Sequence, residues 1–447
     1  MVGRDLAAFA TAFTLAGAAP AAGEVRVLRH GPIDMTGFEV RFPRGEVPAP
    51  RVDGFVTGMH ARLVDARGRP VTIRDVMLHH VVFRRLWSPA SSRPCRSSVG
   101  EAFYGTGEED QSLRLPRGYG YRLRPGDRWR MTAMLMSHTV RARRVYVEYR
   151  VNVDTRNDLM PVRAFWVRAN GCGKQLSYGI GGGGPPGAID LRTFGWKVPL
   201  DGRIVAVGGH LHGGAKDMWL SQPRCDGRRL LGTTPRYGLP GDLVYRARPI
   251  LHEPGPVDTA YFLSRSGIPV HRGETLDLSA AYDAERPHGV MAIMHVYVAP
   301  GPAPPAGCAP LPADRRELVK PRPARTDPPA VHIPLNSLDA RGRPYPITDP
   351  PWPVTSFDGD ATVELRARSF TPTRLSLPAG GTLTWRFLGP EAHNVRYANG
   401  PRLIDAPTLR GGATFSARFG VPGHYELFCS LHPMTMHQVV EVRPPPS

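Results

Sequence analysis

The segment HYELFCSLHPMTMHQVVEV, residues 424–442, decides the fold of the C-terminal part of the chain. It contains two strand-like runs joined by a short turn, and this turn carries Cys429 and His432 in a Cys-x2-His spacing. Upstream, AHNVRYANG (392–400) supplies a further histidine, His393. One thiolate and two imidazoles with a weak thioether suit electron-transferring copper, because this set serves both Cu(I) and Cu(II). The segment therefore predicts a β-domain that holds copper.

Two methionines, Met434 and Met436, follow the second histidine and compete for the thioether position. Ligand order and strand pattern over residues 355–445 resemble the cupredoxin family, which includes plastocyanin, amicyanin and pseudoazurin. The resemblance implies a Greek-key β-sandwich with type 1 copper, and it favours Met436 because the family's axial methionine follows several residues after the histidine. The implied ligands are His393, Cys429, His432 and Met436. The ordinary alternative is that Cys429 is a buried free thiol and that the histidines near it are surface residues. His424 and His437 have no place in the ligand pattern, and we expect both to be surface histidines.

The remaining sequence is typical of an all-β protein. Short runs rich in β-branched and aromatic residues alternate with turns, the chain has 49 Gly and 48 Pro among its 447 residues, and no stretch shows a sustained helical period. A glycine cluster near residue 170 indicates a boundary between domains. The expected architecture is two tandem jelly-roll-like β-sandwiches (24–168 and 169–300), a Pro-rich linker (301–350) and the cupredoxin domain (351–447).

The N-terminus and the cysteines indicate an exported protein. Residues 1–23 have the pattern of a signal peptide, which predicts a secreted, periplasmic or cell-surface location, and no other segment is long enough to span a membrane. The formal charge of +18 comes from scattered arginines without basic clusters, so no nucleic-acid partner is expected. Besides Cys429, four cysteines could form two disulfides in any of three pairings: Cys95, Cys172, Cys225 and Cys308.

Histidines and a methionine mark a second region of possible metal chemistry. His210 and His212 alternate along a predicted strand, so both imidazoles lie on the same face. His79 and His80 are adjacent, and they could share a metal only if a twist or bulge turned them to one side. A thioether partner such as Met291 would select the soft ion Cu(I).

In chain order, HH, H, HxH and M resemble the copper type II, ascorbate-dependent monooxygenases over about residues 50–300. RLPRGYGYRL (114–123) ahead of MLMSHTV (134–140) adds to the resemblance. It implies two type 2-like copper sites, each in its own sandwich and facing the other across a cleft. His79, His80 and His138 would hold the electron-supplying copper, and His210, His212 and Met291 the copper that binds dioxygen. Met294 competes with Met291, but lies on the opposite face of a regular strand.

The implied reaction is hydroxylation of an aliphatic C–H bond of a small molecule by O2. Ascorbate or another one-electron reductant would be the co-substrate, and a redox partner protein is possible. The chain departs from the peptidylglycine enzymes of this family at two positions, with Gly208 in place of a basic residue that grips the substrate carboxylate and His295 in place of a tyrosine. A peptide ending in glycine is therefore not the expected substrate.

Three hypotheses follow. The first is a copper monooxygenase with three copper ions, in which the tethered cupredoxin passes electrons to the hydroxylase unit. The second is a non-catalytic copper-binding or electron-transfer protein, and the third is an adhesion protein without metal in its first 300 residues. His60, His252 and His271 have no assigned role. His288 is close enough to Met291 to line the same cleft, although a solvated turn histidine is the default.

Overall fold

The computed structural model describes residues 23–86, 100–173, 175–347 and 351–445. The predicted signal peptide, except for Gly23, and Cys95 lie outside these residues. The regular secondary structure of the described part is nearly all strand, and its single α-helix is the four-residue α1 (Leu243–Arg246). The prediction of an all-β protein is confirmed. No helix among the described residues is long and apolar enough to cross a membrane.

The first sandwich has two sheets that enclose a core of valines, leucines and aromatic rings. One sheet follows the order β2-β9-β5-β6, with β3 paired to β9. Its strands are β2 (Val40–Arg41), β3 (Arg44–Val47), β5 (Val76–Arg85), β6 (Glu101–Gly107) and β9 (Trp129–Ser137). The facing strands are β1 (Glu24–Met35), β10 (Arg143–Asp154), β4 (Gly54–Val64) and β8 (Tyr119–Leu123), with β7 (Leu113–Arg114) paired to β4.

The second sandwich shares a sheet with the first, because β8 pairs in parallel with β11 (Met160–Arg168). The sheet continues through β22 (Ala292–Pro300), β14 (Gly202–Leu211), β19 (Tyr261–Val270) and β23 (Arg316–Leu318). A second core separates it from β13 (Ile189–Lys197), β20 (Thr275–Asp283), β15 (Ala215–Gln222) and β16 (Arg228–Gly232). Two small pairs complete the domain: β12 (Tyr178–Ile180) with β21 (His288–Val290), and β17 (Pro235–Arg236) with β18 (Asp258–Thr259).

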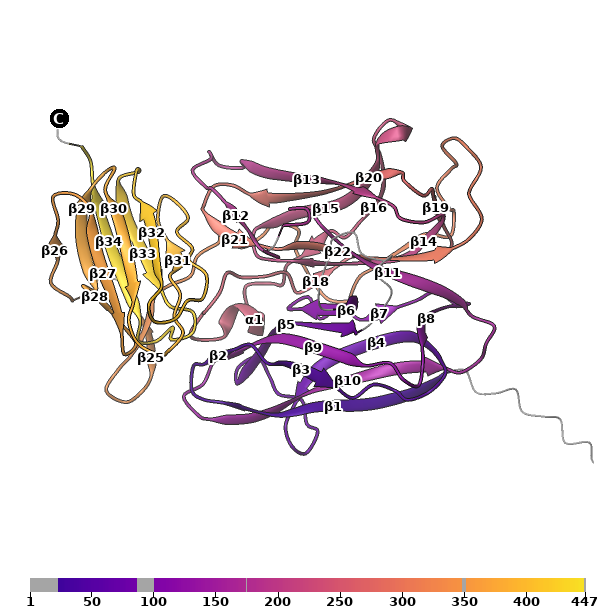
Figure 1. The fold of residues 1–447 in the computed structure, drawn as a ribbon, viewed down its shortest axis with the longest axis horizontal. Coiled ribbons are helices and arrows are strands. Elements are labelled where there is room, and N and C mark those ends of the chain that lie inside the picture. Colours follow the sequence, from indigo (N-terminus) through magenta and orange to yellow (C-terminus); the bar gives the residue numbers. More distant parts are fainter. Residues whose placement is uncertain (1–22, 87–99, 174, 348–350, 446–447) are drawn as a thin grey trace, which may run out of the picture.

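The two sandwiches stack, so that β5 and β6 of the first lie toward β11, β14 and β22 of the second (Figure 1). The segment from residue 301 to 347 then runs along the second sandwich. Its strand β23 pairs with β19, and Arg325 forms a β-bridge with Tyr237. A hairpin of β24 (Asn336–Leu338) and β25 (Pro344–Pro346) leads to the last domain.

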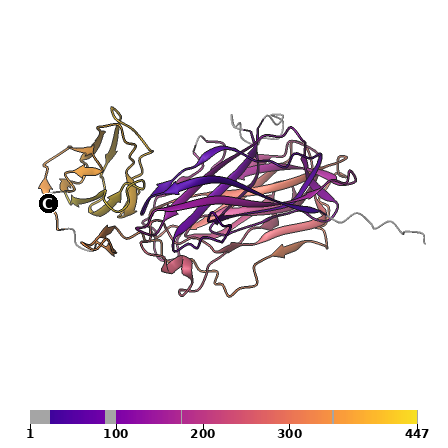
Figure 2. The same ribbon diagram turned by 90° about the horizontal axis from the view of Figure 1, so that it is seen from below.

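The C-terminal domain is a third sandwich at one end of this body (Figure 2). One sheet contains β26 (Thr355–Ser356), β29 (Arg374–Pro378), β34 (His437–Arg443), β33 (Gly423–Phe428) and β31 (Arg396–Asn399). The other contains β28 (Ser369–Thr371), β27 (Ala361–Arg366), β30 (Thr382–Phe387) and β32 (Thr414–Arg418). Trp385 fills the core between them and donates its indole N–H to Gln438 Oε1 at 2.7 Å, which satisfies a buried donor.

One disulfide is fully described. Cys225 and Cys308 are bonded, with their Cα atoms 5.7 Å apart, and this ties the end of β15 to the segment that follows β22. Cys172 is also disulfide-bonded. The structure thus establishes the Cys225–Cys308 bond, which the sequence left open.

Candidate metal centres

The C-terminal centre is built on the tight turn between β33 and β34. His432 donates its backbone N–H to Cys429 O at 3.0 Å, Met436 donates to His432 O at 3.0 Å, and Cys429 donates to Met436 O at 3.1 Å. These bonds fold the Cys-x2-His spacing into one compact loop. His393 comes from a neighbouring segment, which is held by a β-bridge between His393 and Leu409.

The side chains of this turn converge on one point. Ligand atoms of His393, Cys429 and His432 all lie within 4.8 Å of one another. His393 Nδ1 is buried and has no hydrogen-bond partner, which is costly unless an ion takes its lone pair. Burial raises the pKa of the Cys429 thiol and lowers the pKa of His432 to about 4, so the imidazole stays unprotonated and able to bind a metal. The residues present therefore fit a thiolate and imidazole metal site.

The two competing methionines lie in different surroundings. Met436 is fully buried in the same core cluster as Cys429. Met434 points away from that core and packs against the first sandwich, in a cluster with Met77, Met136 and Leu251. Only Met436 is thus placed with the thiolate.

Of the two histidines expected at the surface, one is there. His424 is half-exposed and pairs with Glu441 at 2.8 Å. His437 is buried, its ring stacks on Trp352 with centroids 6.2 Å apart, and its Nε2 lies 2.9 Å from Pro433 O. The prediction for His437 was wrong because this residue begins β34 and faces the packed end of the domain.

The N-terminal histidines form one contiguous cluster between the two sandwiches. His79 and His80 lie on β5, where the pairing with β9 shifts register between Leu78 and His80, so the strand carries the irregularity that a shared site would need. His210 lies on β14, and His212 follows its end. The ring centroids are 5.2 Å apart for His79 and His80, 5.3 Å for His79 and His212, 5.3 Å for His210 and His212, and 6.1 Å for His80 and His210.

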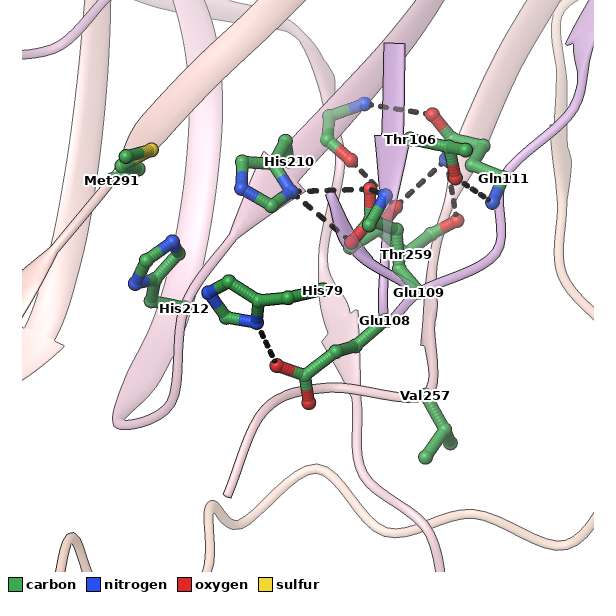
Figure 3. A network of polar contacts seen from close by, with 12 residues as sticks. His79, Thr106, Glu108, Glu109, Gln111, His210, His212, Val257, Thr259 and Met291 are labelled. Atoms are coloured by element: carbon green, nitrogen blue, oxygen red, sulfur yellow. Dashed lines mark hydrogen bonds and ion pairs between the residues drawn. The ribbon is translucent and has the colours of Figure 1, made fainter. Parts of the chain in front are cut away.

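Buried carboxylates face three of these rings through Nδ1. His79 Nδ1 lies 2.8 Å from Glu108 Oε1, and His210 Nδ1 lies 3.1 Å from Glu109 Oε2 (Figure 3). His212 Nδ1 lies 2.8 Å from Glu253 Oε1. Carboxylates in this position orient metal-binding histidines and fix their tautomer. In His210 and His212, Nε2 remains buried and without a partner, as expected of a nitrogen kept for a metal.

Burial also sets the charge of the cluster. It lowers the pKa of His79 to about 3 and raises the pKa of Glu108 to about 7. Burial alone would raise the pKa of Glu253, but the hydrogen bond with His212 and the charges of His212, His252 and His79 together outweigh it and lower the pKa to about 2. His79 is therefore a neutral imidazole. Burial alone would also lower the pKa of His212, but the hydrogen bond with Glu253 and the charges of the nearby glutamates outweigh it and raise that pKa.

A cavity of about 260 Å³ connects this cluster to the C-terminal domain. Met291 lies in its wall together with His212, while Met294 is fully buried in the core of the second sandwich. Phe428 and Ser430, which flank Cys429, line the other side. His288 lines the same cavity and is buried, so the prediction of a solvated turn histidine was wrong.

Two sites facing each other across a cleft were expected, but the structure brings their histidines together. The second set of converging ligands among the described residues is His79, Glu108 and His252, with ligand atoms within 4.8 Å of one another. His138 lies apart, with its Nδ1 2.7 Å from Ile73 O, and shares a smaller pocket with His252. The set His79, His80 and His138, which the resemblance implies for the electron-supplying copper, is therefore not among the converging sets of the described residues.

Sequence reasoning missed four members of the cluster: Glu108, Glu109, His252 and Glu253. The run GEED (107–110) that turns directly after β6 was a detectable signal, since acidic residues are rarely buried without a partner. Gly107 makes this turn possible, because a Cβ there would lie 2.7 Å from His210 Cε1.

The two positions that depart from the peptidylglycine enzymes are both packed. A side chain on Gly208 would collide with Gln111, whose amide oxygen accepts the Gly209 N–H at 3.0 Å. His295 is buried edge-on against Trp166, with centroids 4.7 Å apart, and its Nε2 has no partner. No room is left at residue 208 for a group that binds a carboxylate.

No protein-family model matches the chain. Over 85 residues it is 31% identical to amicyanin-alpha of Methylorubrum extorquens, covering 18% of this chain and 71% of the relative. A solved reduced Cu(I) form of an amicyanin variant matches at 26% identity over 20% of this chain and 85% of that chain, with a TM-score of 0.18. A purple cupredoxin from Nitrosopumilus maritimus matches at 27% identity over 19% of this chain and 100% of that chain, with a TM-score of 0.17.

Proposed function

Because the chain belongs, through its C-terminal domain, to the amicyanin-like cupredoxins, we propose that this domain is a type 1 copper electron carrier for a histidine-rich copper centre between the N-terminal sandwiches. His393, Cys429, His432 and Met436 would hold the type 1 copper. The N-terminal centre would include His79, His210, His212 and Met291. The protein would act outside the cytoplasm, in keeping with the signal-like N-terminus.

The reaction that we propose is copper-dependent monooxygenation of an aliphatic C–H bond. It balances as R–H + O2 + 2 electrons + 2 protons giving R–OH + H2O, with the electrons drawn from ascorbate or another one-electron reductant. Bound copper would supply the one-electron chemistry and the activation of O2. The chain's own contribution is to hold the ligands, to exclude water and to admit a small substrate.

One observation carries the proposal, namely the docking of the copper-binding turn on the N-terminal unit. Met434 lies two residues after His432 and packs against Met77 and Met136. Met77 precedes His79 on β5, and Met136 precedes His138 at the end of β9. A packed contact therefore links the turn to the strands that carry the candidate ligands, which favours electron transfer within one chain over exchange with a distant partner.

The pairing of His210 and His212 with buried glutamates supports a catalytic centre. Glu109 and Glu253 hold the rings through Nδ1 and leave Nε2 directed to the cluster. The adjoining cavity has Met291 in its wall and a largely apolar lining, which suits a small and mostly uncharged substrate beside the site of O2 chemistry.

The alternative is an exported copper-binding and electron-transfer protein without catalysis. The packing around Gly208 favours it, since the usual means of holding a substrate carboxylate is absent at that position. The two functions differ in whether oxygen uptake is coupled to a product.

Oxygen-isotope labelling tests the proposal. Copper-loaded protein is reduced with ascorbate, supplied with labelled O2 and a panel of small aliphatic substrates, and the products are examined by mass spectrometry. We expect one labelled oxygen atom per hydroxylated product, loss of product in His212→Ala, and unchanged product in the control His271→Ala, which alters a histidine outside the cluster. Oxygen consumption without any labelled product would reject the monooxygenase and leave the electron carrier.

A further inference from the structure

We propose that His79, His252 and Glu108 form a divalent copper site, in place of the set His79, His80 and His138 that the resemblance implies. The inference rests on the proposed function only in taking the ion to be copper. His252 and Glu108 have no role in the site described by that resemblance. The assignment follows from convergence, burial and charge.

Convergence is the first argument. Glu108 Oε1 lies 2.8 Å from His79 Nδ1 and 3.3 Å from His252 Nδ1, so one carboxylate oxygen faces both rings. The ring centroids of His79 and His252 are 5.1 Å apart. Three different segments supply these groups: β5, the turn after β6, and the loop that follows α1. Such a meeting of distant segments is what a small ion requires.

Burial and charge form the second argument. The Glu108 side chain is only 7% exposed, its Oε2 has no hydrogen-bond partner, and its ion-pair partners among the described residues are histidines. Among the described residues, the nearby Glu109 and Glu253 also form ion pairs only with histidines. Buried carboxylates without an arginine or lysine are strongly unfavourable, and a bound cation would compensate them.

The alternative ligands are directed elsewhere. The ring of His80 lies next to His210, on the side of the cluster formed by the second sandwich, and its Nδ1 is buried without a partner. The Nδ1 of His138 is held by Ile73 O, as that of His252 is by Glu253 O, but His138 does not belong to the set of ligand atoms that converges around His79. Neither converges with His79 as Glu108 and His252 do.

The donor set indicates the metal and its redox state. Two imidazoles and a carboxylate bind several divalent ions of the first transition row, and among these Cu²⁺ binds most strongly. A carboxylate is a harder ligand than imidazole, so it stabilises Cu(II) over Cu(I). Replacing Glu108 by a neutral residue should therefore raise the Cu(II)/Cu(I) potential of this site.

Copper content of matched variants tests the assignment. The full chain is loaded with Cu(II), passed through a desalting column and analysed for copper per chain. We expect His252→Ala and Glu108→Ala to lose one equivalent, and His80→Ala, His138→Ala and the neighbouring control Asp110→Asn to keep it. The visible thiolate band of the C-terminal domain and the circular dichroism spectrum identify any variant that fails to fold, in which case His252→Gln and Glu108→Gln replace it.

Each possible result either supports or overturns the assignment of the copper site. Full copper content in His252→Ala or Glu108→Ala overturns the site, as does loss of an equivalent in His80→Ala or His138→Ala. A potential that stays unchanged in a copper-retaining Glu108→Gln would show that the carboxylate only orients His79, and this also overturns the assignment. Because none of these measurements requires turnover, a chain that hydroxylates nothing would reject the proposed function and leave the site intact.

Discussion

Two histidines of the N-terminal cluster, His210 and His212, have a carboxylate beside Nδ1 and a buried Nε2 without a hydrogen-bond partner among the described residues. A hydrogen bond at Nδ1 selects the tautomer in which Nε2 carries a free lone pair. The two carboxylates therefore orient these rings for a metal.

At the C-terminal centre, the two methionines make a matched pair for a test. We expect Met436→Leu to raise the reduction potential of the copper, because the loss of the axial donor leaves a three-coordinate site that Cu(I) tolerates better than Cu(II). Met434→Leu should leave the potential unchanged, since this side chain packs on the first sandwich. A redox titration of the visible band measures both, and a shift found only in Met434→Leu would reverse the assignment.

Gly107 is required by the close approach of β6 to His210. In Gly107→Ala the new methyl group would lie 2.7 Å from His210 Cε1 and 2.7 Å from His79 O. We expect a loss of about 1–3 kcal/mol in the free energy of unfolding, as is usual for overpacking, together with weaker copper binding. Gly289→Ala, where a Cβ meets nothing within 4 Å, is the control. Equal stability of both variants would show that the ring moves aside freely.

Single residues also show where sequence reasoning ends. Period two was enough to place His210 and His212 together, and the Cys-x2-His spacing was enough to find the C-terminal centre. Neither signal finds the glutamates. The run GEED marks Glu108 and Glu109 as unusual, but the ion pair of Glu109 with His210 joins the turn after β6 to β14, and this contact depends on how the two sandwiches stack.

Among the elements, the strand pair β33 and β34 positions the C-terminal ligands. Its register joins Phe428 to His437 and Tyr425 to Val440, so the whole Cys-x2-His turn closes one end of a hairpin. Both strands could be predicted from the sequence, because their residues either alternate between apolar and polar or form a continuous apolar run. The pairing of β8 with β11 was not visible, since a parallel contact between two domains leaves no turn signal.

The hairpin also carries a pH-dependent ion pair. Glu426 and Glu441 raise the pKa of His424 to about 8, above its unfolded value, so the stabilisation is complete below about pH 6.5 and is lost as the pH rises through 8. The side chain is 43% exposed, which limits the contribution to at most about 1 kcal/mol. Denaturation of wild type and His424→Gln at pH 6 and pH 9 should give a difference only at pH 6. A difference that grows at pH 9 would contradict the sign.

The disulfide stabilises the second sandwich independently of the metal centres. It joins residues separated by 83 positions, and its removal in Cys225→Ser with Cys308→Ser should cost about 2–4 kcal/mol. Copper content should not change, because the bond lies at the end of β15 away from the histidine cluster. Calorimetry and copper analysis of the double variant check both statements, and loss of copper would connect the disulfide to the site.

For the whole molecule, the central feature is the position of the C-terminal sandwich against the other two. The contact uses Met434 on one side and Phe38, Val40, Met77, Met136 and Leu251 on the other. The sequence predicted three domains and a tether, but a docking surface made of scattered apolar residues has no pattern of its own. The structure therefore adds the direction in which the copper-binding turn faces.

This contact can be broken without touching a ligand. Met434→Asp would bury a carboxylate in an apolar cluster, so we expect the domain to leave its docked position while its copper site stays intact. Small-angle scattering should show a larger radius of gyration, with the visible band unchanged. Met434→Leu, which keeps the apolar contact, is the control, and equal scattering of both variants would show that other contacts hold the domain.

The most direct test of the account is the rate at which the reduced cupredoxin gives its electron to O2. Fully reduced, copper-loaded protein is mixed rapidly with O2, and the return of the visible thiolate band is followed in wild type, His212→Ala and Met434→Asp. We expect both variants to be slower by at least about tenfold, or about 1.4 kcal/mol in activation free energy, because the electron passes through the docked contact to the histidine cluster. Equal rates in all three proteins would contradict it.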